Sequence, residues 1–389
     1  MTMASARNSS LAAGNRRRRG AGIRRGEALS GWLLSAPVLV ALILFLVIPI
    51  LMAAWVSVSD WQGHGSPLSS DVSFVGMKNY ASITVGGGLS VKTFGWSMRN
   101  TLWYVILVVP IQTALALFLA NLVNGARLRG KGFFRTAFYF PSVTSAVAIT
   151  VLWLFLFSGS GAVNRTLGWI GIHGPNWFND PQGIITALLS GLGLKNGPPA
   201  LVNHGFLGVS WWNWIGGPSW AMSALMIEAI FTTSGTFMLL FIAALQNLSP
   251  DVDEAAIVDG ANGWQRFWQV TLPQLKPTIF TVLTLGMIGC WQVFDQIYTL
   301  PTPCAPGYTT CSPAYMSYQA GFQNQQWGQA CAIAFILLVI IILFTLLQRF
   351  ILRDREKTDA SRAERRRLNT AGGIGLALMR NRGGGLGAV

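Results

Sequence analysis

The chain has 389 residues, of which 52% are hydrophobic and only 11% are charged, and its formal net charge is +14. A soluble domain of ordinary composition carries about a quarter charged residues, so this chain cannot cover a water-facing surface and its apolar excess must face lipid. The basic residues flank apolar segments instead of forming a basic groove, which argues against nucleic-acid binding.

Two tails frame the apolar part of the chain. Residues 1–29 and 353–389 are rich in Arg, Gly, Ala and Ser, and we expect both to be basic, disordered segments. The residues between them, 30–352, form the predicted membrane domain.

Six apolar segments are long enough to cross a bilayer, which needs about 20 mostly apolar residues. The composition therefore predicts an all-α integral membrane protein, a bundle of six transmembrane helices. The first segment could instead be a cleaved signal peptide, but its apolar run is much longer than a signal core of about 7–15 residues and no A-x-A site follows it. The six predicted spans are residues 31–57, 101–123, 136–157, 218–245, 277–299 and 328–350.

The positions of Lys and Arg predict the orientation. If the N-terminus is placed inside, 23 of the 28 basic residues fall on the inner side and five on the outer side. Because positive charge concentrates in cytoplasmic segments, both termini are predicted to be cytoplasmic.

The connection between the third and fourth predicted spans is unusually apolar for an external loop, and it contains an insertion at about residues 181–217. Residues 183–194 are too few to cross a bilayer, so we interpret them as an interfacial or re-entrant helix with nearby tryptophans at headgroup level. A seventh and an eighth span are the alternative.

Two cysteines, Cys304 and Cys311, lie in the loop between the fifth and sixth spans, which this topology places outside. Thiols in an oxidising compartment can form a disulfide. A bridge between them is therefore expected, and two free thiols are the alternative.

The segment 249–273 is the most informative part of the chain. Ser249 can serve as a helix N-cap, Pro250 suits the first helical position, and acidic residues follow in the first turn. Gly260 allows a turn, a second short helix follows, and Pro273 is expected to stop it. The pattern predicts a helical hairpin in a cytoplasmic loop, and an amphipathic loop lying on the membrane is the alternative.

The residues of this hairpin closely resemble the signature of the permease subunits of binding-protein-dependent ABC importers. That resemblance implies a coupling helix that docks into a cleft of a separate ATPase subunit. Motifs at 74–80 and 130–135 resemble the same family, and those at 294–298 and 317–322 resemble its sugar-importer branch, although Thr-Pro-Cys304 replaces the usual Gly-Gly-Pro. The positions that match the coupling signature are Glu254, Ala255, Ala256, Asp259, Gly260, Ala261, Phe267 and Pro273.

The resemblance also implies the partners and the cargo. They are a second, similar permease, a dimer of ATPase subunits that holds ATP and Mg²⁺, and an external solute-binding protein. The cargo is a di- or oligosaccharide, with glycerol-phosphate compounds as the alternative, and the location is the plasma membrane, with several passes through the lipid bilayer.

The chain itself is predicted to bind no cofactor and no metal, and to have no catalytic residues. The run from Gly125 to Lys131 begins like a phosphate-binding P-loop, but Gly132 stands where Ser or Thr is required. The three histidines lack metal-ligand spacing.

Polar residues inside membrane spans are costly and usually face a cavity. In relatives that this chain resembles, substrate contacts come from the middles of spans three, four and five. Sugar sites combine carboxylates and amides with an aromatic platform, which Trp291 beside Gln292 would fit, whereas hydrogen bonding between helices is the alternative role. The candidates for the substrate pathway are Ser142, Thr144, Ser145, Glu228, Thr232, Thr233, Trp291, Gln292 and Asp295.

Two other functions compete with an ATP-driven importer. An ion-gradient-driven secondary transporter is compatible with acids inside the spans, but the sequence shows no inverted repeat. A membrane enzyme would need a catalytic set, and the sequence contains no such motif.

Overall fold

The computed structural model describes residues 30–86, 88–125, 128–193 and 197–351. These residues are mostly helical, with one short antiparallel hairpin of β1 (Gly205–Phe206) and β2 (Val209–Ser210). Five helices are long and apolar enough to cross a membrane, or six if one bent pair forms a single span. The prediction of an all-α membrane protein is confirmed, with five or six spans where six were expected. The tails predicted at 1–29 and 353–389 lie outside the described residues.

The described part of the predicted single domain forms two compact units. The first unit takes residues up to 97, 199–211 and 313–336, and the second takes 98–198, 212–312 and residues from 337 onward.

In the first unit, the side-chain amide of Asn79 donates to the carbonyls of Ser57 and Ser59, at 3.0 and 2.9 Å. Ser57 is the last residue of the first span, and carbonyls at a helix C-terminus have no partner within the helix, so Asn79 supplies one. The helices of this unit are the first span Ser30–Ser57 with its segments η1 (Ile43–Val47) and α2 (Ile48–Ser57), α3 (Lys78–Thr84), the start of α4 (Leu89–Asn124), α9 (Pro199–Asn203), α17 (Pro313–Tyr318), η3 (Gln319–Gln323) and the start of α18 (Trp327–Ile351).

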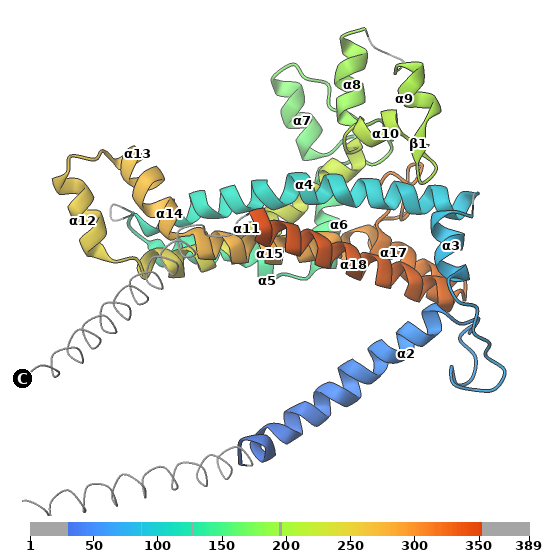
Figure 1. The fold of residues 1–389 in the computed structure, drawn as a ribbon. Helices are drawn as coiled ribbons and strands as arrows, with labels where there is room; N and C mark the ends of the chain where they lie inside the picture. Colours follow the sequence, from blue (N-terminus) through green and yellow to red (C-terminus); the bar gives the residue numbers. More distant parts are fainter. Residues whose placement is uncertain (1–29, 87, 126–127, 194–196, 352–389) are drawn as a thin grey trace, which may run out of the picture. The chain divides into compact units, whose positions relative to one another are not determined.

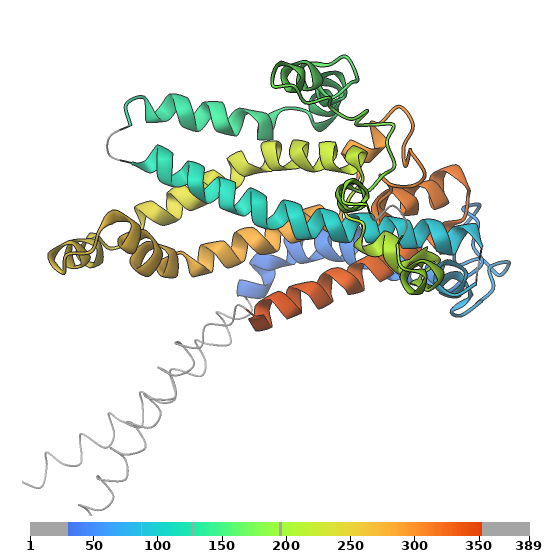
Figure 2. The same cartoon turned by 90° about the horizontal axis from the view of Figure 1, so that it is seen from above.

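The second unit is a bundle with a hairpin at one end. Figures 1 and 2 show the remainder of α4 running beside α11 and α15, and the hairpin α12–α14 projecting beyond them. The further helices of this unit are α5 (Lys131–Val143), α6 (Ala146–Leu156), α7 (Ala162–Trp169), α8 (Ile184–Gly191), most of α10 (Trp211–Ile215), α11 (Trp220–Gln246), α12 (Pro250–Val258), α13 (Gly263–Arg266), η2 (Phe267–Thr271), α14 (Leu272–Gln274), α15 (Lys276–Trp291), α16 (Asp295–Tyr298) and the end of α18.

Helix α11 is the centre of the second unit, and α5 is its most extensive neighbour. The two backbones approach closely at Gly235, where an added Cβ would overlap the carbonyl of Phe138 on α5. Small residues allow this approach in membrane bundles, where van der Waals packing holds helices together. A buried cluster continues the contact to α4 and α15 through Ala116, Ala120, Val123, Phe237, Met238, Phe241, Ile242 and Val282.

The third predicted span is broken. Helices α5 and α6 meet at 96°, so the expectation of one continuous helix over 136–157 is wrong. Pro141 lies within the last turn of α5, Thr144 then adopts an extended backbone conformation, and Ser145 is also non-helical. The Thr144 hydroxyl donates to the carbonyl of Phe140 at 3.0 Å, which satisfies a group that the break releases.

The other spans differ less from prediction. Helix α4 begins at Leu89 instead of near residue 101, and the fifth span is interrupted between Trp291 and Asp295. In the insertion, α8 (Ile184–Gly191) lies within the helix predicted at 183–194. Arg99, only 3% exposed, donates to carbonyls of Asn213 and Gly217 and so ties the end of the insertion to α4.

Candidate coupling hairpin and translocation cavity

The hairpin between α11 and α15 begins as the sequence predicts. Ser249 occupies the N-cap with an extended backbone, and Pro250 stands in the first turn of α12 with Asp251 and Asp253. The Ser249 hydroxyl makes no capping hydrogen bond, so the first turn depends on proline preorganisation and on acids at the positive end of the helix dipole.

Gly260 ends α12 with a left-handed residue at φ +81°. The Gly260 N–H donates to the carbonyl of Ile257 at 3.0 Å, and the Ala261 N–H donates to that of Ala256 at 2.9 Å. This pair of bonds is a Schellman motif, which terminates the helix and reverses the chain. A Cβ at Gly260 would meet no described atom within 4 Å, so within this chain the backbone alone requires glycine.

The second limb of the hairpin starts with a capping box. The side-chain oxygen of Asn262 accepts a hydrogen bond from the backbone N–H of Gln265. The side-chain oxygen of Gln265 accepts one from the backbone N–H of Asn262, and both distances are 2.9 Å. The limb then continues through η2 and α14 to Gln274. Pro273 therefore does not stop it, because proline in the first turn of α14 needs no N–H donor. The helical run is interrupted only at Leu275, which separates α14 from α15.

An ion pair joins the two limbs. The Nε of Arg266 donates to Oδ1 of Asp253 at 2.8 Å, and its Nη2 contacts Oδ2 of the same carboxylate. The two-point contact fixes the orientation of α13 relative to α12, because a guanidinium fork matches a carboxylate.

The hairpin exposes apolar side chains outside the bundle. Val258 is 86% exposed and Trp264 is 71% exposed, and the carboxylates of Glu254 and Asp259 are exposed beside them. Phe267 is half-buried against Trp268. Exposed large apolar side chains on a structured loop are a feature of protein contact sites.

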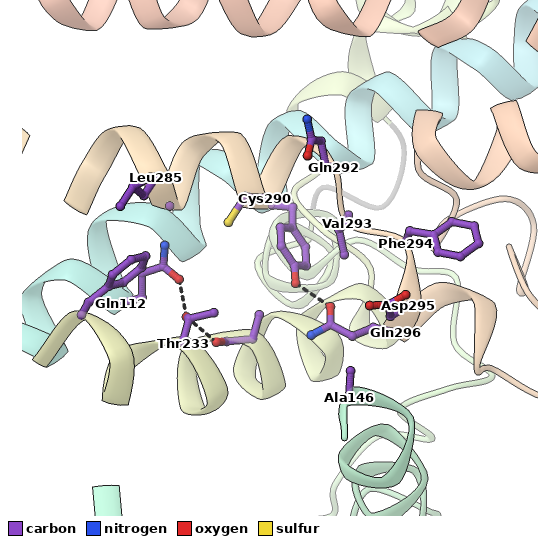
Figure 3. A pocket seen from close by; sticks show the side chains of 15 residues that line it. Gln112, Ala146, Thr233, Leu285, Cys290, Gln292, Val293, Phe294, Asp295 and Gln296 are labelled. Atoms are coloured by element: carbon purple, nitrogen blue, oxygen red, sulfur yellow. Dashed lines mark hydrogen bonds between the residues drawn. The ribbon is translucent and has the colours of Figure 1, made fainter. Parts of the chain in front are cut away.

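A cavity of about 250 Å³, lined by both polar and apolar residues, lies between α4, α6, α11, α15 and the interruption before α16 (Figure 3). Its lining residues are Tyr104, Gln112, Ala146, Ala229, Thr233, Phe237, Leu285, Gly286, Gly289, Cys290, Gln292, Val293, Phe294, Asp295 and Gln296.

Two hydrogen bonds cross this cavity (Figure 3). The Thr233 hydroxyl donates to Oε1 of Gln112 at 2.6 Å, and the Tyr104 hydroxyl donates to Oε1 of Gln296 at 2.8 Å. Gln112 is 1% exposed, and its Nε2 has no partner among the described residues. Gly286 makes room for this amide, since a Cβ there would overlap it.

A second cavity of about 250 Å³ adjoins the first and shares Thr233 and Gln296 with it. The break between α5 and α6 opens onto it. Its lining residues are Pro141, Ser142, Thr144, Ala146, Ile149, Glu228, Thr232, Thr233, Thr236, Phe237 and Gln296.

Glu228 is the buried carboxylate of this second cavity, at 1% exposed. Its Oε1 accepts a hydrogen bond from the Thr150 hydroxyl at 2.7 Å. Its Oε2 has no partner among the described residues. A buried carboxylate oxygen without a partner carries a large desolvation cost, so this atom is available to a ligand hydroxyl.

The structure brings together most of the residues predicted for the pathway. Seven of them line the two cavities: Ser142, Thr144, Glu228, Thr232, Thr233, Gln292 and Asp295. Ser145 is exposed at the start of α6. Trp291 does not line either cavity, so it provides no aromatic platform there. It is 1% exposed and packs against Phe344 with a ring-centroid distance of 5.2 Å. Adjacent residues of a helix point in different directions, so Gln292 can line the cavity while Trp291 does not.

Four polar lining residues lie outside the candidate set: Tyr104, Gln112, Thr236 and Gln296. Gln112 stands in the middle of the uncharged second span, and the cost of an amide in lipid could have identified it. Tyr104 and Gln296 carry no such signal, because both lie near the ends of predicted spans.

The loop before α17 is cross-linked, since Cys304 and Cys311 form a disulfide in the structure. The amide of Asn100 on α4 donates to the carbonyls of Tyr308 and Cys311, at 2.8 and 3.2 Å. The loop is therefore held to α4. Among the described residues, no group of three or more His, Cys, Asp and Glu is arranged to hold a metal ion.

Membrane-crossing helices around cavities that contain polar side chains, with an exposed helical hairpin beyond them, are typical of a membrane transport subunit. Comparison with known proteins gives the class. The sequence profile described as "Binding-protein-dependent transport system inner membrane component" matches residues 112–357.

Similar curated proteins include the "Lactose transport system permease protein LacF" of Rhizobium radiobacter, 28% identical over 86% of this chain and 97% of that protein. The "Multiple sugar-binding transport system permease protein MsmF" of Streptococcus mutans is 30% identical over 82% and 93%. The "Trehalose/maltose transport system permease protein MalF" of Thermococcus litoralis is 28% identical over 82% and 92%.

The fold is also similar to a chain of a solved "bacterial ABC transporter involved in the import of the acidic polysaccharide alginate". The TM-score is 0.61 with 21% identity, over 86% of this chain and 98% of that one.

The chain belongs to the family of binding-protein-dependent transport system inner membrane components. It is a multi-pass inner-membrane permease subunit of an ABC importer, as the resemblance of its sequence implied. An ion-gradient-driven transporter and a membrane enzyme are thereby set aside.

Proposed function

We propose that this permease carries a di- or oligosaccharide delivered by an external solute-binding protein. The relatives described above are named as permeases of lactose, trehalose/maltose and multiple-sugar transport systems. Among apolar residues, the two adjoining cavities present hydroxyls, amides and the carboxylates of Glu228 and Asp295, which are groups that pair with sugar hydroxyls. This lining is the observation that carries the proposal.

In this proposal the chain forms half of the translocation pathway, and a second, similar permease forms the other half. Both termini and the hairpin 249–273 are cytoplasmic. The external protein delivers sugar to the opposite side, where the cavities open in one state of the transport cycle.

The hairpin transmits the work of ATP hydrolysis. A dimer of separate ATPase subunits binds ATP and Mg²⁺, and its closure moves the hairpin. Three features support this role: the ion pair of Asp253 with Arg266, the Schellman turn at Gly260 and the exposed apolar Val258. Together they make a stiff, protruding surface that transfers motion to α11 and α15, the helices on either side of it.

Uptake by the purified complex tests the proposal. The tagged chain is purified from its native membranes, its co-eluting subunits are identified, and the complex is placed in liposomes with ATP inside. We expect accumulation of a labelled neutral disaccharide or oligosaccharide only with ATP and the binding protein present. ATP-dependent uptake of a non-sugar solute by the same complex, with no sugar accumulated from a broad panel, would overturn the sugar assignment.

A further inference from the structure

A further cavity, of about 360 Å³, lies in the first unit and shares no residue with the two cavities of the second unit. Part of its lining is residues 59–62, directly after the first span, which ends at Ser57. Another part is residues 324–329, around the start of α18 at Trp327. The ends of transmembrane helices lie at the level of the lipid headgroups, so this cavity lies at headgroup depth.

Close packing fixes the walls of this headgroup-level cavity. A Cβ at Gly63 would overlap the indole of Trp327, and a Cβ at Gly328 would overlap the side-chain amide of Asn79. The rings of Trp61 and Trp327, which both line the cavity, lie 5.8 Å apart. Tryptophan favours the membrane interface because its ring is apolar and its N–H is polar. The cavity is therefore a shaped site with two tryptophans typical of that depth.

The headgroup-level cavity contains one charge of each sign. Asp60 and Lys78 both line it, and neither makes an ion pair with a residue that the structure describes. The hydroxyl and the backbone N–H of Ser73 donate to the two oxygens of Asp60, at 2.5 and 2.7 Å, and hold the pKa of that carboxyl below its ordinary value. Each oxygen keeps a further acceptor site. A ligand that carries both a cation and an anion matches this pair of charges.

Carboxamide side chains supply much of the remaining polar lining. Each offers two N–H donors and one acceptor oxygen. Together they can donate to the oxygens of a phosphate and accept from the hydrogens of a primary ammonium group. The carboxamides whose side chains make no hydrogen bond to a described residue are Gln62, Asn324, Gln326 and Gln329.

Exposed apolar side chains adjoin the polar lining. Phe74 and Met77 belong to the segment just before Lys78, and Phe322 contacts Trp327 with a ring-centroid distance of 4.8 Å. A saccharide could use the carboxamides, but it would leave both charges unneutralised and these apolar side chains uncovered. A phospholipid supplies a charged headgroup for the cavity and acyl chains for the apolar side chains.

We propose that this cavity binds the headgroup of phosphatidylethanolamine, a zwitterionic phospholipid with a primary ammonium group. Asp60 and the carboxamide oxygens accept hydrogen bonds from the ammonium, and Lys78 and the carboxamide N–H groups bind the phosphate. Phosphatidylcholine has no ammonium hydrogen to donate, and phosphatidylglycerol has no cation for Asp60. The site does not depend on which solute the transporter carries.

Native mass spectrometry of the complete transporter in detergent measures the affinity for the first bound lipid. Phosphatidylethanolamine, phosphatidylcholine and phosphatidylglycerol with identical acyl chains are added in separate titrations. We expect phosphatidylethanolamine to bind about fivefold more tightly than either of the others, which is the effect of one partly exposed charge pair. Soluble phosphoethanolamine should bind far more weakly, because it has no chains to cover the apolar side chains.

Substitutions assign the preference to this cavity. Asp60→Asn should remove the preference for phosphatidylethanolamine over phosphatidylglycerol, because the ammonium loses its charged acceptor. Lys78→Gln should weaken the binding of all three phospholipids, since each carries the phosphate. The matched controls are Asp71→Asn and Lys92→Gln, which remove the same charges from exposed residues of the first unit that do not line the cavity, and they should leave the affinities unchanged.

Equal affinity for the three phospholipids overturns the proposal, and so does an Asp60→Asn transporter that keeps the preference. If soluble phosphoethanolamine binds as tightly as the lipid, the site takes a free zwitterion and the lipid assignment is wrong. If Asp60→Asn fails to assemble, Lys78→Gln decides: lipid binding no weaker than in Lys92→Gln overturns the proposal. Failure of sugar uptake in liposomes would overturn the proposed function and leave the lipid result intact.

Discussion

Replacing Gly260 with Asp tests whether the hairpin transmits motion to or from another protein. Gly260 has φ +81°, and the left-handed region costs a non-glycine residue about 1–2 kcal/mol, with Asp near the lower end. An added side chain would meet no described atom within 4 Å. The structure therefore predicts only about 1 kcal/mol of local destabilisation, too little to prevent folding or membrane insertion.

The effect on transport should be much larger. If a partner surface lies against the turn, an added carboxylate at Gly260 introduces both bulk and an unpaired charge at the contact. We expect Gly260→Asp to reduce ATP-driven uptake at least about a hundredfold, because leaving a charge unpaired at a contact costs about 3–5 kcal/mol.

Gly171→Asp is the matched control. Gly171 has φ +78°, and a Cβ there also meets no described atom within 4 Å, so the backbone cost is the same. The assay compares expression, thermal stability and uptake in liposomes for both variants. The reasoning is refuted if Gly260→Asp keeps normal uptake, or if Gly171→Asp loses as much.

Three further predictions concern a close helix approach, the hairpin ion pair and the disulfide of the second unit. Gly235→Val should lower the free energy of unfolding by roughly 1–3 kcal/mol through overpacking against α5. Gly289→Ala adds a Cβ that meets no described atom within 4 Å, and it should be neutral or slightly stabilising. Equal losses in the two variants would contradict the close approach of α11 to α5 at Gly235. Arg266→Gln should reduce uptake several-fold while costing less than about 1 kcal/mol of stability. Arg266→Lys should restore little of the uptake, because lysine cannot make the two-point contact with the carboxylate. Full uptake with Arg266→Gln would show that the ion pair does not orient the two limbs of the hairpin. Replacing both Cys304 and Cys311 with Ser should cost about 2–3 kcal/mol, as expected for a bridge across a sequence separation of 7; an unchanged melting temperature under non-reducing conditions would contradict this.

The sequence predicts the membrane helices well because lipid imposes a single strong requirement. Long apolar runs must be helical to satisfy their backbone groups, and α11 and α18 lie within a few residues of the predicted spans. The break between α5 and α6 was missed, because hydropathy measures the composition of 136–157 and is insensitive to the 96° bend after Pro141.

The hairpin and the cavity differ in how far the sequence predicts them. Local rules suffice for the Schellman turn at Gly260 and for Pro250 in the first turn. The cavity depends on which faces meet. Trp291 and Gln292 are adjacent in sequence, yet one packs against Phe344 and the other lines the cavity. Gln112 became part of the site only through its contact with Thr233 from a distant helix.

A site-specific cross-link tests the coupling role of the hairpin most directly. A photoreactive amino acid is placed at Val258, which is 86% exposed on the hairpin, or at Leu192, which is 81% exposed at the end of α8 in the insertion. The complete transporter is irradiated in its native membranes, and the cross-linked partner is identified. We expect Val258 to capture the ATPase subunit and Leu192 not to do so. Capture of lipid alone from Val258, in a complex that still contains the ATPase, would contradict the coupling role.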